Sequence, residues 1–501
     1  MSHVAKAQLL ILCLFPLTSH AAPIGIFEDQ KDIGTLLHPG SSSLDSNLKT
    51  YTLSAAGENM WAAKDAFHYL FSKSTGDLSL SADISFIGTG ADKHRKAGLM
   101  IRQSLDADSA YIDVALHGDG LTSLQFRESK GALTHEVQSN LTNPKRLRLE
   151  KRGQFIRLYL STDSTKDEDL KFSGASHRLT FADPFFVGLA LCSHNKDITE
   201  SATFSNVQLN TNLPTPTAKP TLYSTLETQS LSSTDRRITY TTNARIEAPN
   251  WLRDGTTLIY NQAGRIYRIP VIGGQPEVIN TGFATRCNND HAPSPDGVLL
   301  AISDQSQGNR QSLIYTLPIT GGTPKLITPI GPSYFHGWSP DGKILAFCAQ
   351  RNNEFDIYTI PASGGPDAST ETRLTSAKGL DDGPEYSPDG KSIYFNSDRT
   401  GQMQIWRMNP DGSGQEQITT DTFNNWFPHP SPDNKKLLFL SYSPDVKGHP
   451  ENQLVSLRVL NLSTNKIDLL ANLFGGQGTI NTPCWSPDSK KIAFISYHLI
   501  P

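Results

Sequence analysis

Three histidines lie in similar places relative to a recurring turn in the sequence. His291, His336 and His429 each come shortly before a Ser-Pro-Asp tripeptide. Neutral imidazoles joined by an amide or a carboxylate are a ligand set that suits a divalent metal. These three residues are therefore our hypothesis for a metal site, with manganese, zinc or calcium as the ion. The alternative is that they hydrogen-bond to backbone amides around a wet channel.

The segments before the turns also carry acids, amides, aromatic residues and an arginine that a turn does not require. Candidates for catalysis or substrate contacts are Asp381, Asp382 and Arg286. Candidates for ligand binding are Glu247, Asn289, Tyr334, Asn425, Trp426 and Gln477. The two aromatic side chains of this second set can stack on sugar faces, and packing within a channel is their alternative role. The arginine can pair with a carboxylate through two hydrogen bonds.

The turn that follows these segments is repeated along the second half of the chain. SPDG occurs at Ser294–Gly297, Ser339–Gly342 and Ser387–Gly390, and SPDN, SPDS and RDG variants occur elsewhere. Proline presets φ, aspartate bonds nearby backbone, and glycine tolerates a left-handed conformation. The turn aspartates, 42 to 55 residues apart, are Asp254, Asp296, Asp341, Asp389, Asp433 and Asp488. A period of this length, filled by strands, is typical of propeller blades.

Each repeat has room for four strands, which make one blade. The last repeat reaches only two strands before Pro501, and two more strand-like segments, Thr221–Leu231 and Arg236–Thr241, precede the first turn. Placing these segments in the last blade closes the ring with strands from both ends and removes an open sheet edge. We therefore predict a six-bladed β-propeller over residues 222–501. The loops that lead into the innermost strands should converge on one mouth of its channel, bringing the candidate residues together.

The region before the repeats has the two-residue periodicity of half-buried strands, as in Leu78–Ile84 and Phe155–Leu160. Helical periodicity is almost absent, so we predict an all-β sandwich over residues 24–210. Residues 211–221 contain three prolines and no strand pattern, which predicts an exposed linker. Residues 1–21 combine a lysine, a short apolar run and small residues, as signal peptides do. We therefore expect an exported protein, periplasmic or secreted.

Composition argues against several functional classes. The 501 residues carry a formal net charge of −4, which disfavours a general nucleic-acid binder. No apolar run after the signal segment approaches the length of a transmembrane span. A serine hydrolase is not expected, because the sequence has no G-x-S-x-G motif. The cysteines after the signal segment are far apart and predict lone buried thiols: Cys192, Cys287, Cys348 and Cys484.

Two further polar groups lie in the N-terminal region. We predict that His94, Arg95 and Lys96 form a solvated loop. A second set is a candidate sugar or calcium site: Asp106, His117 and Asp119. The alternative for this second set is that its members are polar residues of ordinary turns.

The repeats resemble the periplasmic TolB propeller and its relatives. The shared features are the aromatic-SPDG turn, an I-Y strand and a GG-x-P outer strand, as in Ile272–Ile279 and Ile319–Ile327. The N-terminal region looks instead like a concanavalin or laminin-G-like sandwich, a resemblance carried by Ala97–Arg102 and Tyr111–Ala115. Sandwiches of that kind often accompany carbohydrate-active proteins. This combination departs from the TolB of the Tol–Pal system.

The histidine set is similar to that of oligogalacturonate lyases, which are propellers that hold manganese with three histidines and a glutamine. This resemblance implies that His291, His336 and His429 are ligands, with Gln477 as the fourth. A metal bound to a uronate carboxylate would acidify the neighbouring carbon and allow β-elimination.

Three functions follow as alternatives. The first is an exported protein whose propeller mouth binds a glycan or an envelope protein. The second is a metal-assisted polysaccharide lyase that uses the histidine set. The third is an envelope scaffold of the Tol type.

Overall fold

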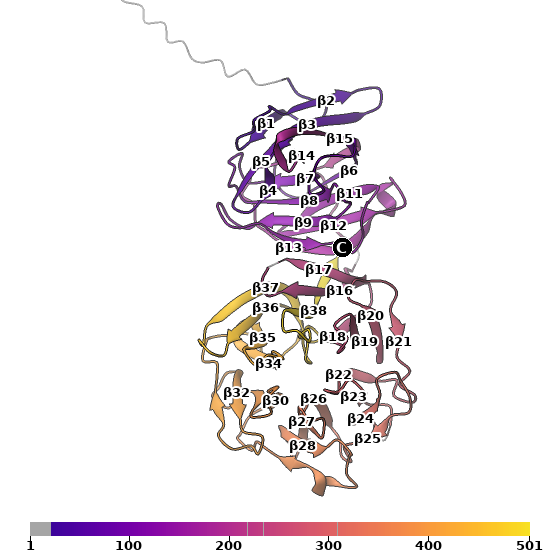
Figure 1. Ribbon diagram of the computed structural model, residues 1–501, viewed down its shortest axis with the longest axis vertical. Helices are drawn as coiled ribbons and strands as arrows, with labels where there is room; N and C mark the ends of the chain where they lie inside the picture. The colour runs from indigo at the N-terminus through magenta and orange to yellow at the C-terminus, as the bar shows by residue number, and fades with distance from the viewer. Residues whose placement is uncertain (1–21, 218, 234, 308) are drawn as a thin grey trace, which may run out of the picture.

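The computed structural model describes residues 22–501 except 218, 234 and 308, so the predicted signal peptide lies outside the described residues. The described chain is built from β-strands, with two single-turn 3₁₀ helices at Asp167–Asp169 and Ala368–Thr370. A sheet-rich N-terminal region and a propeller lie end to end along the long axis of the molecule (Figure 1). The all-β class expected from the sequence is confirmed.

The N-terminal region contains two antiparallel sheets. The first has the order β1 (Asp29–Ile33), β5 (Lys64–Ser74), β14 (Phe185–Cys192), β7 (Lys96–Arg102), β8 (Tyr111–His117), β9 (Thr122–Arg127) and β10 (His135–Gln138), with β4 (Asn59–Trp61) paired to β5. The second has the order β13 (Lys171–Arg178), β12 (Phe155–Ser161), β11 (Arg146–Arg152), β6 (Leu78–Ile87), β15 (Asn195–Asn210), β3 (Thr50–Gly57) and β2 (Ser41–Asp45). Leu99 and Leu189 of the first sheet share one apolar cluster with Leu80 and Leu149 of the second. The two sheets therefore bury their facing side chains between them.

Five sheets of four antiparallel strands surround the centre of the propeller. We number these blades in chain order. Blades one and two are β18 (Ile246–Trp251), β19 (Thr257–Gln262), β20 (Arg265–Pro270), β21 (Glu277–Val278), then β22 (Cys287–Pro293), β23 (Leu299–Asp304), β24 (Leu313–Pro318), β25 (Lys325–Leu326). Blades three and four are β26 (Ser333–Trp338), β27 (Ile344–Arg351), β28 (Glu354–Pro361), β29 (Thr372–Arg373), then β30 (Asp381–Tyr386), β31 (Ile393–Ser397), β32 (Gln404–Met408), β33 (Glu416–Gln417). Blade five is β34 (Asn424–Pro430), β35 (Lys436–Tyr442), β36 (Glu451–Asn461), β37 (Ile467–Gly476).

The count of five four-stranded blades differs from the predicted six. The remaining strands of the repeat region are β17 (Arg236–Thr242), β16 (Thr221–Ser230) and β38 (Lys491–Ile500), in that order. Strands from both ends do pair, because β16 lies antiparallel to β38 along its whole length. However, β17 also pairs in parallel with β10 of the N-terminal region. These strands therefore belong to one 11-stranded sheet that crosses from the N-terminal region into the propeller.

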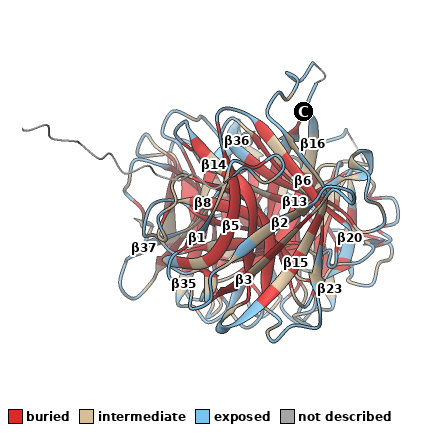
Figure 2. Cartoon of the chain, turned by 90° about the horizontal axis from the view of Figure 1, so that it is seen from above, coloured by how far each residue is buried: buried red, intermediate tan, exposed pale blue. Residues whose placement is uncertain are grey.

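The repeated turn is held by a local set of hydrogen bonds. In blade three, Ser339 Oγ donates to Asp341 Oδ1 at 2.7 Å and accepts the N–H of Ile344 at 2.9 Å. Gly342 follows with φ of 70°, the left-handed conformation that glycine adopts without strain. Such turns lie at the surface, and Figure 2 shows exposed loops around strands that are mostly buried. The turn chemistry expected from the sequence is the chemistry that the structure uses.

The structure also bears on the cysteines and on membrane-spanning helices. All four cysteines of the described residues are free and buried, as predicted. Within the same residues, no helix is long and apolar enough to cross a lipid bilayer.

Candidate functional site at the channel mouth

Each innermost strand loses its pairing register partway along its length. The ladder shifts between Asp382 and Glu385 in β30 and between Trp426 and His429 in β34. Gly383 and Phe427, which lie at the bend, have φ of 64° and 55°. A bulge of this kind redirects side chains. The residues just before each bulge lie at the end where the preceding loop enters, and we call this end the channel mouth.

Four segments of the propeller contribute polar side chains to one group of contacts at the channel mouth. His336 Nε2 lies 3.2 Å from Asp382 Oδ1, and His449 Nε2 lies 4.0 Å from Asp382 Oδ2. His449 Nδ1 also contacts Gln477 Oε1, which accepts the Nδ2–H of Asn481 at 3.0 Å. We call His336, Asp382, His449, Gln477 and Asn481 the mouth network. It connects blades three, four and five with the segment that leads to β38.

The carboxylates at the channel mouth have strongly perturbed acidity. Burial would raise the pKa of Asp382, but the charge and hydrogen bond of His336 hold it well below its usual range. Burial opposes protonation of His336, yet the Asp382 carboxylate raises the pKa of that imidazole. For Asp290, burial raises the pKa to about 6, although the nearby His336 charge lowers it. Asp290 Oδ2 accepts a hydrogen bond from Asn288 Nδ2 at 2.7 Å.

The structure does not bring the three predicted histidines together as a metal-binding group. His291 is fully buried and neither of its ring nitrogens has a hydrogen-bond partner among the described residues, while burial lowers its pKa to about 4. His429 Nδ1 lies 2.6 Å from Glu385 Oε2, and its Nε2 contacts the carbonyl of Ile480. No group of three or more His, Cys, Asp or Glu with metal-binding geometry occurs among the described residues. The three-histidine basis of the lyase hypothesis is therefore missing.

Strand geometry explains why His429 differs from the other two histidines. His291 and His336 lie five residues before their turn aspartates, whereas His429 lies four residues before Asp433. Successive residues of a strand point to opposite sides, so an offset of one residue turns a side chain away from the others. The partner of His429 is Glu385, which lies at the same offset in the neighbouring blade.

The other predicted residues divide between the channel mouth and the blade interior. Arg286 is exposed in the loop before β22, and Asn289 is buried within that strand. Asn425 is buried and donates to Gln404 Oε1 and Thr419 Oγ1, so it holds blades four and five together. Asp381 is likewise occupied, with its Oδ2 2.7 Å from Arg399 Nη2.

The two aromatic candidates and the remaining acid lie closer to the mouth network. Trp426 is 1% exposed, its ring centroid lies 4.4 Å from that of His449, and its Nε1 has no hydrogen-bond partner in the part of the chain that the structure describes. Tyr334 is half-buried beside Phe355. Glu247 Oε1 lies 3.0 Å from Arg245 Nε. The alternative role of packing therefore describes Trp426 better than sugar stacking on an open surface.

Sequence reasoning missed Asp290, His449 and Asn481. Asp290 adjoins the predicted His291, but the bulge that brings it beside His336 and Asp382 is not visible in a single sequence. His449 lies in the loop between β35 and β36, outside the segments that precede the turns. One signal was present, because the longest interval between turn aspartates, from Asp433 to Asp488, contains this loop.

In the N-terminal region, the predicted solvated loop is wrong for two of its three residues. Arg95 is 4% exposed and its Nη1 lies 2.7 Å from Glu200 Oε2. Lys96 begins β7, and its Nζ donates to Asn59 Oδ1 at 2.7 Å. Both cations are buried because they have oxygen partners there. His94 remains partly exposed.

The predicted sugar or calcium group of this region is also dispersed. Asp106 pairs with Lys130 at the surface, with 2.6 Å between carboxylate and Nζ. His117 is buried against Gln125. The Gln125 side-chain amide donates to His117 Nε2 at 3.1 Å in the tautomer in which Nε2 carries no hydrogen. Asp119 accepts the N–H of Leu121 at 3.1 Å, as an ordinary turn residue does.

Comparison with known proteins identifies the propeller. Residues 331–494 match the family described as the TolB beta propeller domain. An uncharacterized protein of Agrobacterium fabrum is 49% identical over 275 residues, which are 55% of this chain and 92% of that protein. A solved structure from Agrobacterium tumefaciens that is named for TolB is 48% identical, with a TM-score of 0.53, and the match covers 56% of this chain and 99% of that one. The chain belongs to the TolB-like β-propeller family.

More distant relatives match shorter parts of this TolB-like protein. A TolB homolog of Chlorobium luteolum is 31% identical over 127 residues, which are 25% of this chain and 27% of the relative. The Tol-Pal system protein TolB of Bordetella pertussis is 45% identical over 56 residues, 11% of this chain and 12% of that protein. The chain thus spans about a quarter or less of these two relatives.

Proposed function

We propose that this TolB-like protein binds a protein partner at the channel mouth of its propeller. The observation that supports the proposal most directly is the buried acid Asp290, beside His336 and Asp382. Burial raises the pKa of Asp290 to about 6, so keeping it charged near neutral pH works against folding. Residues held at such a cost often serve binding rather than stability.

The chemistry of the channel mouth favours a basic partner segment. Asp290 and Asp382 supply carboxylates, and Glu247 adds a third that is matched by Arg245. The Asp382 carboxylate raises the pKa of His336, yet even a protonated His336 offsets only one of the two carboxylates of Asp290 and Asp382, so the local charge stays negative when both are ionised. A lysine, an arginine or a free amino terminus is the complement of such a site.

The setting we propose is the cell envelope. The segment 1–21 has the composition of a signal peptide, and one relative is named as a Tol-Pal system protein. An exported protein partner is therefore our proposal, in preference to a glycan.

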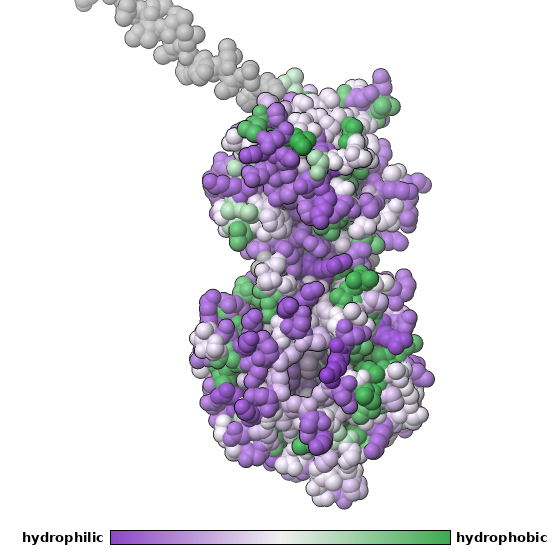
Figure 3. Space-filling view, in the orientation of Figure 1, coloured by the Kyte–Doolittle hydropathy of each residue, from purple (hydrophilic) through white to green (hydrophobic). Residues whose placement is uncertain are grey.

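We also propose that β16, β17 and β38 occupy the sixth blade position and close the ring at the N-terminal region. The face of the propeller that Figure 3 shows is largely polar, and it has a hollow near its centre.

Site-specific cross-linking tests this proposal. A photoreactive phenylalanine analogue is placed at Arg286, in the loop that enters blade two, and as a control at Lys343, which follows the turn at the opposite end of blade three. We expect a protease-sensitive adduct from envelope extracts only at position 286, reduced roughly tenfold by Asp382→Asn. Equal adducts at both positions, or an adduct indifferent to Asp382→Asn, would contradict binding at the channel mouth.

A further inference from the structure

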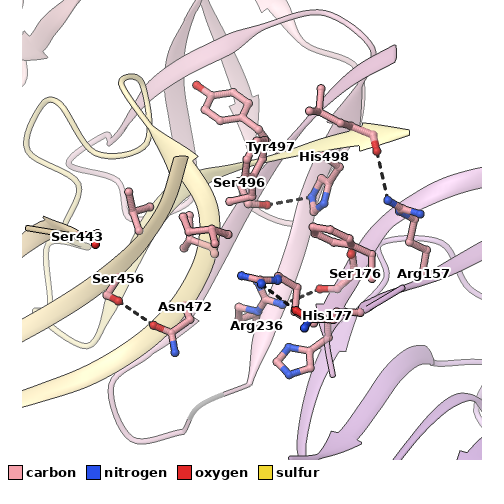
Figure 4. Close-up of a pocket in the computed structure, with 18 of the residues that line it drawn as sticks. Arg157, Ser176, His177, Arg236, Ser443, Ser456, Asn472, Ser496, Tyr497 and His498 are labelled. Carbon is pink, nitrogen blue, oxygen red and sulfur yellow. Dashed lines mark hydrogen bonds between the residues drawn. The ribbon is translucent and has the colours of Figure 1, made fainter. Parts of the chain in front are cut away.

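A cavity of about 470 Å³ lies where the N-terminal region meets the propeller. Its walls come from β12 and β13 on one side, from β36 and β37 of blade five on another, and from β38 between them (Figure 4). No member of the mouth network lines it. A volume of this size is in the range of small-molecule binding sites, and such sites occur preferentially between domains.

One wall of the cavity is cationic. Arg157 is only 5% exposed, and its sole hydrogen bond to the described residues runs from Nη2 to the carbonyl of Leu499 at 3.2 Å. Its Nε and Nη1 are themselves buried and have no hydrogen-bond partner among those residues, and the nearest carboxylate oxygen, on Glu150, is 3.8 Å from Nη1. A buried guanidinium group with a single hydrogen bond is costly, and a ligand in the cavity can offer it a further acceptor.

A second arginine lies on the same side of the cavity. Arg236 Nη2 donates to the carbonyl of Ser176 at 3.2 Å, and its Nη1 lies 3.4 Å from Glu227 Oε2. Figure 4 shows Arg157 and Arg236 on either side of His498. Burial, together with these two cations, lowers the pKa of His498 to about 3, so its imidazole is neutral at ordinary pH. Glu128, an acid that lines the cavity, lies 3.1 Å from His177 and is itself largely exposed.

The opposite wall combines apolar side chains with small polar ones such as Ser456 and Asn472. Leu454, Leu473 and Phe474 of blade five line it, and Leu454 is 49% exposed. An inorganic anion gains no binding free energy from apolar side chains. A ligand with a hydrocarbon part does, because it buries that part against them. A carboxylate at one end of that ligand matches the fork of a guanidinium group.

We propose that this cavity between the N-terminal region and the propeller binds a small amphipathic carboxylate, with its carboxylate on Arg157 and its hydrocarbon part against blade five. Arg157 then gains an acceptor in addition to the carbonyl of Leu499. Because the walls belong to both parts of the molecule, such a ligand contacts the N-terminal region and the propeller at once. The site is separate from the channel mouth.

Calorimetric titration of the chain from residue 22 to 501 tests the proposal with three probes: octanoate, octanamide and inorganic phosphate. We expect octanoate to bind, and octanamide and phosphate to bind at least about tenfold more weakly. Equal binding of octanoate and octanamide would show that no carboxylate is recognised. Phosphate binding as tight as octanoate, or no octanoate binding, would also overturn the proposal.

Matched variants locate the binding. Arg157→Gln should weaken octanoate by about tenfold or more, whereas Arg148→Gln, on the adjacent strand β11 and outside the cavity lining, should leave it unchanged. Ser456→Trp places a large side chain in the cavity from blade five, leaves both arginines in place and should abolish octanoate binding. This variant tests the site even if the Arg157→Gln protein fails to fold. Unchanged octanoate binding in Ser456→Trp would place the ligand elsewhere. Asp382→Asn should not affect octanoate, which separates this result from the fate of the proposed mouth function.

Discussion

The acids at the channel mouth show how position along one strand decides the role of a side chain. Asp382 and the neighbouring Asp381 were predicted as a pair, yet only Asp382 joins the mouth network. Asp381 pairs instead with Arg399 inside blade four. Asp290 and His449 could not be predicted, because one depends on a bulge and the other on a loop from a different blade. Residue types were therefore informative, but their grouping required the strand register.

The raised pKa of Asp290 leads to a prediction about stability. The pKa is about 6 in the folded protein, against an ordinary value of 3.8, so folding favours the protonated form. The stability contributed by that form is complete below pH 3.8 and is lost as pH rises through 6. Asp290→Asn should therefore raise the free energy of unfolding at pH 7.5 by on the order of 3 kcal/mol, with little change near pH 4.

Urea denaturation of both proteins at the two pH values measures this effect. Asp296→Asn is the contrasting control, because the hydrogen bond from Ser294 lowers the pKa of Asp296 and that variant should lose stability at pH 7.5. A less stable Asp290→Asn protein at pH 7.5 would mean that the charged carboxylate stabilises the fold.

At the scale of the element, the repeated turn was the most predictable feature. Its hydrogen bonds join residues no more than five positions apart, as from Ser339 to Asp341 and Ile344, so sequence spacing is sufficient to identify it. The way in which β16, β17 and β38 pair was not predictable in the same way. The pairing of Val137 with Arg236 and of Gln138 with Arg237 connects segments about a hundred residues apart. A local sequence pattern does not predict a contact between segments so far apart.

The turn hydrogen bonds give a prediction for blade three. Ser339→Ala removes a donor to Asp341 and an acceptor for the Ile344 N–H, so it should lower the free energy of unfolding by about 1–2 kcal/mol. Lys343→Ala in the same turn is the control, because its contact with Asp341 at 3.6 Å is at the surface and contributes little. Chemical denaturation compares the two. Equal losses would mean that the serine contributes nothing beyond other turn residues.

At the scale of the whole molecule, the predicted division into a sandwich, a linker and a propeller omits the sheet that joins them. No strand occupies the described residues between Asn210 and Thr221, but β10 and β17 pair directly beside that segment. Further contacts reinforce the junction, including Asn140 Nδ2 to the carbonyl of Thr239 at 3.1 Å. The propeller therefore has a neighbour along one strand edge.

Removing that neighbour has a predictable result. A fragment of residues 211–501 leaves the β17 edge without β10, and an unpaired strand edge invites pairing with another copy. We expect the fragment to keep its β circular dichroism but to form larger species at concentrations where the full chain does not. Light scattering after size exclusion measures the masses. If fragment and full chain give the same oligomeric state, the β17 edge is protected in another way.

The pairing of β10 with β17 also fixes the orientation of the N-terminal region relative to the propeller. Because a continuous backbone ladder joins the two parts, a molecule held on the N-terminal region cannot swing freely relative to the channel mouth. A molecule bound to the N-terminal region would therefore be held at a constant orientation and a constant distance relative to the propeller. The protein can thus set the geometry between two bound objects without either one touching the other.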